Sequence, residues 1–139
     1  MGVILDTSVL IAAEKQRLDL PLFFSAHPLE TFHLSAITAS ELLHGVARAQ
    51  PLARRVARTA FVEKVLAEIE TIDFDLAVAR RHAELWAELE KQGAVIGAYD
   101  LVIAATAVHH GHRLATLNRD EFRRVPGLQL VDLADFLEN

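Results

Sequence analysis

The sequence contains no cysteine, which excludes disulfide bonds and zinc sites built on thiolates. No apolar run approaches the ~20 residues of a membrane-spanning helix, so we expect no membrane partner. No basic region precedes a signal-type apolar segment at the start, so we expect a cytoplasmic protein that is not exported. The formal net charge of −5 argues against general nucleic-acid binding by the whole surface, although a local basic face is compatible with it.

The sequence is instead rich in alanine, leucine and valine, and 52% of its 139 residues are hydrophobic. A chain of this length buries roughly two-thirds of its unfolded surface, so it needs neither a disulfide nor a structural metal to fold. It has no internal repeat, low-complexity tract or Gly/Ser linker. We therefore expect a single domain over residues 1–139.

Short apolar segments alternate with longer amphipathic segments along the chain. The first of them, residues 3–5, is typical of a strand that is buried on both faces of a parallel sheet. The predicted strands are 3–5, 31–35, 113–117 and 128–131, and residues 71–74 are expected as a short strand or an extended link. The predicted helices are 9–15, 19–24, 37–49, 51–69, 76–92, 101–110, 118–124 and 133–137. This alternation predicts an α/β fold with a parallel sheet.

Acidic or amide side chains follow three of the predicted strands or open a predicted helix. In a parallel sheet the strand ends and the following helix starts lie on one edge, so these side chains are expected to converge there. Asp6 follows the first strand, and Glu41 is expected in about the first turn of the helix after the second strand. Asp100 precedes a nearly all-apolar helix. The residues at these junctions are Asp6, Glu41, Asp100, Asn118, Asp120 and Glu121.

Each of these side chains also has an ordinary structural explanation when it is taken alone. Asp6 and Asp100 are suitable helix N-caps, and a negative charge early in a helix suits the helix dipole at Glu41. Asp120 and Glu121 are compatible with a solvent-exposed surface. Glu41 and Asp100 are, however, flanked by core-forming residues, where an unpaired charge is costly, and this favours a shared site.

A shared site of carboxylates predicts a divalent cation. Carboxylates within ~4–6 Å of one another resist ionising together, and a cation removes that repulsion. Oxygen ligands without cysteine or histidine suit Mg²⁺ or Mn²⁺. Such a site is typical of phosphodiester hydrolysis, in which the metal neutralises the phosphate and lowers the pKa of a bound water.

Four stretches, in this order and spacing, resemble a PIN domain, and more narrowly the VapC-type toxins of prokaryotic toxin–antitoxin pairs. They are residues 4–8 (ILDTS), 40–42 (SEL), 99–105 (YDLVIAA) and 116–122 (TLNRDEF). The resemblance implies a three-layer α/β/α fold around a mostly parallel sheet and an endoribonuclease that uses Mg²⁺ or Mn²⁺. It also implies an RNA substrate, with tRNA as a candidate, and a homodimer. A cognate antitoxin would insert a peptide near the site, and promoter DNA would be bound only through the antitoxin complex.

The resemblance assigns roles to the residues of the first three stretches. Asp6, Glu41 and Asp100 match the acids that hold a metal ion or its water. Thr7 and Ser8 match polar positions that support the first acid.

The last stretch departs from the family pattern. Thr116 matches a hydroxyl position beside the fourth acid, but Asn118 stands where many relatives carry Asp. Asn118 can donate an oxygen ligand or orient a water without bringing a charge. Asp120 or Glu121 is expected to compensate for the missing charge.

Two arginines near this stretch, Arg113 and Arg119, are candidates for contacts with the RNA backbone, because phosphate neutralisation dominates nucleic-acid affinity. Two other functions are compatible with parts of this pattern. A PIN-like fold with weakened metal affinity would be a binding module for an antitoxin or RNA. A phosphoryl-accepting receiver domain also gathers aspartates around Mg²⁺, but it needs paired acids after the first strand and a lysine after a late strand, and the sequence has neither.

Overall fold

A computed structural model of the chain describes residues 2–138 and contains a four-stranded sheet in the order β3-β2-β1-β4. All three strand pairings are parallel, with Gly2 opposite Thr31 and Val3 opposite Arg113. The strands are β1 (Gly2–Leu5), β2 (Thr31–Ser35), β3 (Glu70–Ile72) and β4 (Arg113–Ala115). The inner strand β1 is buried at every position.

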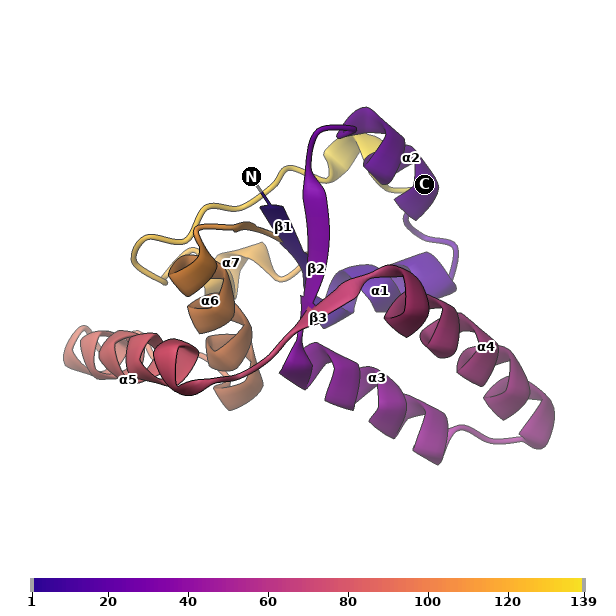
Figure 1. Cartoon of the computed structure of the whole chain (residues 1–139), viewed down its shortest axis with the longest axis horizontal. Helices are drawn as coiled ribbons and strands as arrows, with labels where there is room; N and C mark the ends of the chain where they lie inside the picture. The colour runs from indigo at the N-terminus through magenta and orange to yellow at the C-terminus, as the bar shows by residue number, and fades with distance from the viewer. Residues whose placement is uncertain (1, 139) are drawn as a thin grey trace.

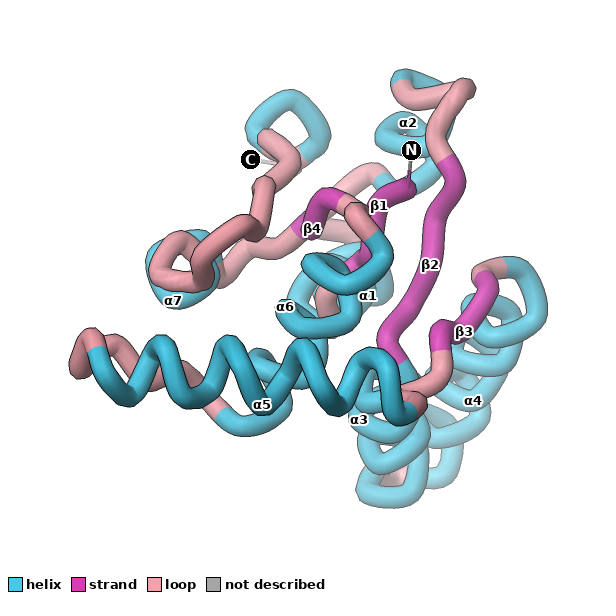
Figure 2. Tube along the Cα trace, turned by 60° about the vertical axis from the view of Figure 1, so that its left-hand side comes forward, coloured by secondary structure: helices cyan, strands magenta, loops and turns pink. Residues whose placement is uncertain are grey.

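Helices cover both faces of this sheet (Figure 1). They are α1 (Thr7–Glu14), α2 (Leu20–Ala26), α3 (Ala36–Arg48), α4 (Leu52–Glu68), α5 (Leu76–Lys91), α6 (Ala98–His110), α7 (Arg119–Phe122) and the 3₁₀ turn η1 (Ala134–Phe136). In Figure 1, α1, α2 and α4 lie to one side of the strands and α5, α6 and α7 to the other. Figure 2 shows α5 crossing the fold as a long rod below α6.

The alternation of side chains along β1 produces two apolar layers. Val3 and Leu5 pack with residues of α1, α2 and α4. Ile4, between them in sequence, packs with residues of α5, α6 and α7 on the opposite face. Successive strand residues point to opposite faces, so three consecutive apolar residues bury both sides of the sheet. The predicted α/β/α fold is confirmed, and no helix within residues 2–138 has the length and apolar character needed to span a membrane.

Two predictions near the C-terminus are wrong. Residues 128–131 form no strand, and only one parallel bridge joins Leu114 to Leu130. The turn at Gly127, where φ is +78°, precedes this bridge, and the Asp132 side chain closes another turn directly after it, so little chain is left in register. Residues 133–137 form the short turn η1 instead of an α-helix, because Leu137 is extended and bridges to Leu18.

Candidate active site

Asp6 follows β1 directly and is 3% exposed. Its Oδ1 accepts a hydrogen bond from the Thr7 amide at 2.8 Å and caps α1. Its Oδ2 accepts hydrogen bonds from the Ser8 and Thr116 hydroxyls, each at 2.7 Å. The Asp6 amide also donates to the Ala115 carbonyl at 2.9 Å, which ties the residue to β4. Asp6 is therefore a helix cap and a rigidly held carboxylate at once.

Glu41 reaches the same edge of the sheet from α3. It is the sixth residue of that helix and lies in its second turn, because α3 begins at Ala36, one residue earlier than predicted. Its Oε1 accepts a hydrogen bond from the Thr7 hydroxyl at 2.8 Å. Thr38, which is fully buried and was not anticipated, lies 3.1 Å from the same hydroxyl. Thr7 thus links the α1 start to the Glu41 carboxylate.

Asp100 enters from α6, which begins three residues earlier than predicted, so the acid lies inside its first turn. Gly97, and not Asp100, is the N-cap. Burial raises the pKa of Asp100 to about 7, and the charge and hydrogen bond of Glu121 add to it, followed by the charges of Asp6 and Glu41. The acids of four separate segments therefore interact at one edge of the sheet.

Glu121 is the fourth carboxylate of this group. Its Oε1 accepts the Gly97 amide at 2.6 Å, and its Oε2 accepts the Asn118 side-chain amide at 2.6 Å. The Gly97 amide, and after it Asn118 and Asp100, lower the pKa of Glu121 against the opposing effect of burial. Asn118, which the sequence pattern placed at the fourth acid, orients Glu121 by its side chain. The i, i+3 spacing of Asn118 and Glu121 on a short helix is the signal that links them.

The other predicted residues of α7 point elsewhere. The Asp120 side chain is 93% exposed and pairs with Arg123 at 2.9 Å, so it does not join the acids. Arg119 lies on α7 at this edge, but its Nη1 donates to the Val131 carbonyl at 2.7 Å. One N–H donor of its guanidinium is therefore already used in a hydrogen bond within the chain.

The placement of Arg113 near the acids is wrong. It begins β4, so it lies at the amino end of that strand, whereas Thr116 follows the carboxyl end. Its Nη2 pairs with Glu30 at 2.6 Å, and both side chains are largely buried. Arg113 therefore stabilises the opposite edge of the sheet.

The acids fit a hard divalent cation by ligand type and charge. None of the ion pairs within residues 2–138 involves Asp6, Glu41 or Asp100, so no lysine or arginine neutralises them. In the same part of the chain, no three His, Cys, Asp or Glu side chains surround one point as a preformed metal cage. Mg²⁺ needs only one or two protein carboxylates and takes water at its remaining positions, so a cage is not required.

This arrangement has clear relatives. The profile of the PIN domain family matches residues 3–128. The chain belongs to the PIN domain family. Ribonuclease VapC1 of Rickettsia felis is 34% identical over 134 residues, which cover 96% of this chain and 98% of that protein. The tRNA(fMet)-specific endonuclease VapC of Shigella flexneri is 34% identical over 99 residues, or 71% of this chain and 73% of that protein.

A solved structure agrees with this assignment. The DNA-bound VapBC structure from Salmonella typhimurium matches with a TM-score of 0.86 at 30% identity, and the match covers 96% of this chain and 98% of that chain. The predicted resemblance to PIN domains of the VapC type is therefore confirmed for the fold and the family. The roles of the individual acids remain predictions.

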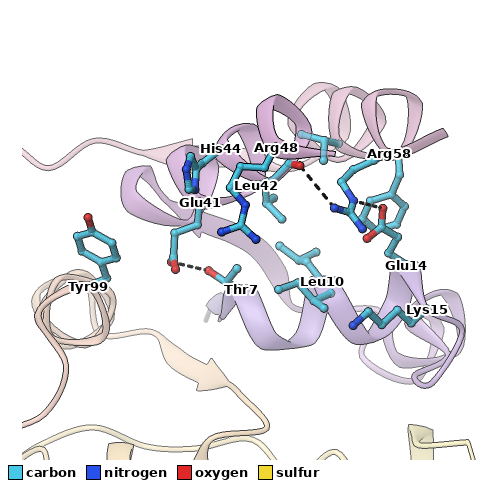
Figure 3. A pocket seen from close by; sticks show the side chains of 14 residues that line it. Thr7, Leu10, Glu14, Lys15, Glu41, Leu42, His44, Arg48, Arg58 and Tyr99 are labelled. Carbon is cyan, nitrogen blue, oxygen red and sulfur yellow. Dashed lines mark hydrogen bonds and ion pairs between the residues drawn. The ribbon is translucent and has the colours of Figure 1, made fainter. Parts of the chain in front are cut away.

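Two clefts of this PIN domain flank Glu41. The larger, of about 450 Å³, runs between α1, α3 and α4 and has an apolar floor that includes Leu10 and Leu42 (Figure 3). The smaller, of about 400 Å³, is lined by Glu41 and residues 97–100. Glu41 and Tyr99 are the two residues that line both.

The buried hydroxyl of Thr116 gives the first test of this PIN domain. It donates to Asp6 and accepts the Asn118 amide at 3.0 Å. Thr116→Val keeps the side-chain shape and leaves that amide without its partner, so the free energy of unfolding should fall by about 1–3 kcal/mol. Denaturant unfolding measures it, with Thr59→Val, on an exposed helix face, as the control. Equal stability of Thr116→Val and the wild type would contradict this bonding pattern.

Proposed function

We propose that the chain is a Mg²⁺- or Mn²⁺-dependent endoribonuclease of the VapC type, which acts as the toxin of a toxin–antitoxin pair. The observation that carries this proposal is the convergence of four carboxylates from separate segments at the carboxyl edge of the sheet. Burial, and after it the charges of the other three acids, raises the pKa of Asp100. Membership of the PIN domain family and the VapC ribonuclease relatives support the same activity.

Asp6, Glu41 and Asp100 would hold the metal ion. When bound, that ion would neutralise the scissile phosphate and lower the pKa of a water molecule. The chain's own polar groups keep the ligands in place: Ser8 and Thr116 fix one oxygen of Asp6, and Thr7 fixes Glu41.

Glu121 would complete the negative pocket from the side of α7. Its carboxylate is held against Asp100 by the Gly97 amide and by Asn118. Asn118 therefore contributes by orienting an acid, and the site keeps four carboxyl groups although this position is an amide. The same edge of the sheet is open at the two clefts that flank Glu41, which provides room for an RNA strand.

Cleavage of a mixed tRNA pool tests the proposal. The wild type is expected to cut at few positions with Mg²⁺ or Mn²⁺ and not with EDTA. Asp6→Asn removes a charge and keeps a side chain that caps helices well, so it should fold and lose at least about 100-fold in activity.

Asp120→Asn is the matched control, because it removes an exposed charge from a neighbouring helix. It should cut as the wild type does. Cleavage that persists in EDTA would exclude the metal mechanism, and equal cleavage by Asp6→Asn would exclude this site. A wild type that cuts nothing with either metal would favour the alternative, a PIN-fold binding module.

We also propose that a cognate antitoxin covers the cleft of Figure 3, as the VapBC neighbour suggests. Its apolar floor and its rim of Lys15 and Arg48 suit an amphipathic peptide with acidic residues. Promoter DNA would be bound through that complex only. A homodimer is supported by exposed apolar side chains on α5, among them Leu76 and Trp86.

A further inference from the structure

Tyr99 is the one tyrosine of the chain and stands next to the candidate metal ligand Asp100 in the first turn of α6. Its side chain is 58% exposed, although the helix it belongs to is among the most buried of the fold. Figure 3 shows its ring on the α6 side of the larger cleft, with Glu41 on the α3 side. An exposed aromatic ring thus stands at the entrance to the acids.

The ring is not used by the fold itself. Within residues 2–138, the aromatic contacts join the phenylalanines around Phe23 and several histidines, and none includes Tyr99. The phenol likewise makes no hydrogen bond inside that range, although a tyrosine that supports packing usually finds one when buried. Contacts within the fold therefore do not explain why an aromatic residue stands at this position.

The position of the ring relative to the acids suggests what it contacts. Tyr99 and Glu41 line both clefts, so a strand that occupies both would run beside these two side chains. A phosphate at the acids would place the adjoining bases beside them. Unpaired RNA bases stack on aromatic side chains, and each such contact contributes about 5- to 150-fold in affinity.

We propose that Tyr99 stacks on an unpaired base next to the scissile phosphate and positions the RNA strand over the acids. The inference rests on the proposed ribonuclease function and adds one contact to it, between Tyr99 and a base turned out of its stack. Because a purine offers the larger face, the nucleotide at this position should be a purine more often than a pyrimidine. Tyr99 is a positioning residue in this scheme and takes no part in the chemistry.

Cleavage of a short single-stranded RNA that contains the wild-type cut site tests this. Tyr99→Leu should lose about 10-fold in kcat/KM, mainly through KM, whereas Tyr99→Phe should stay within about 2-fold of the wild type. Substrates with one abasic nucleotide on either side of the cut then identify the stacked base. On the substrate that lacks this base, Tyr99→Leu and the wild type should cut at the same rate.

RNA binding separates the failure of this inference from the failure of the ribonuclease itself. In the Asp6→Asn background, fluorescence anisotropy with a labelled oligoadenylate should give an affinity that Tyr99→Leu weakens about 10-fold. Equal affinity and equal cleavage with leucine would overturn the role of Tyr99 alone and leave the ring to a protein partner. A loss in Tyr99→Leu that is equal on every abasic substrate would also overturn it. A chain that neither binds nor cuts RNA would overturn both proposals.

Discussion

Asp100→Asn is expected to lose RNA cleavage by at least about 100-fold and, at the same time, to make the metal-free protein more stable. The loss follows because an amide supplies no charge to a metal ion. The gain follows because burial, together with the charges of three neighbouring acids, raises the pKa of the wild-type carboxyl to about 7. A variant that is inactive because it misfolds would show the opposite change in stability.

The gain in stability should depend on pH. In the unfolded chain Asp100 ionises near its ordinary value of 3.8, whereas in the metal-free fold it keeps its proton until about pH 7. The wild type therefore loses stability between pH 4 and pH 7 relative to the variant, and the difference is constant above that range. Because the side chain is partly exposed and the Glu121 pKa moves the other way, we expect only about 1–2 kcal/mol at pH 8 after allowance for solvent screening.

Thermal unfolding in EDTA at pH 4 and at pH 8 measures this difference. Adding Mn²⁺ should then raise the melting temperature of the wild type more than that of Asp100→Asn, since an ion that binds only the folded state stabilises it by mass action. Asp120→Asn is the control for a lost surface charge. Equal metal shifts in the wild type and in Asp100→Asn would place the ion elsewhere.

Phe122→Ala is expected to lower the free energy of unfolding by about 3–5 kcal/mol. The ring is fully buried and packs in the apolar layer with Leu114 and Val125. For a domain of ordinary stability, this loss is about a fifth or more of the free energy of unfolding and lowers the melting temperature by about 10 °C or more.

The same ring fixes α7, which has four residues and carries Glu121. Cleavage by Phe122→Ala should therefore fall at temperatures where the chain is still folded, because the fourth carboxylate is no longer held. Leu29→Ala is the control, since it removes an apolar side chain that is 94% exposed. A Phe122→Ala protein with wild-type stability would contradict the anchoring of α7.

The sequence correctly predicted those strands and helices whose apolar side chains are buried in a regular pattern. Three apolar residues before Asp6 predicted a strand covered on both faces, and the helices followed from their apolar periodicity. Residues 128–131 have the same apolar character but follow a turn and precede another, so they form only one bridge. The composition of a segment does not show whether the turns on either side leave enough residues in register to form a strand.

The sequence predicted that acids at the strand ends converge on one site, but it did not predict how the individual side chains are oriented there. Asp6, Glu41 and Asp100 converge as the parallel topology requires. The sequence left open whether Asp120 or Glu121 compensates for Asn118, because that depends on which side chains of a four-residue helix face the acids. Arg113 was misplaced because an arginine three residues before Thr116 lies at the far end of a short strand.

The place of Asp6 directly after an inner strand has a consequence for how firmly each acid is held. Its amide is bonded to Ala115, and β1 lies between β2 and β4, so the backbone at Asp6 is fixed by the sheet itself. Glu121 stands on the four-residue helix α7, where the Gly97 amide and the Asn118 side chain hold its carboxylate. Elements with fewer enclosing contacts open at a lower free energy, so we expect Glu121 to be held less rigidly than Asp6.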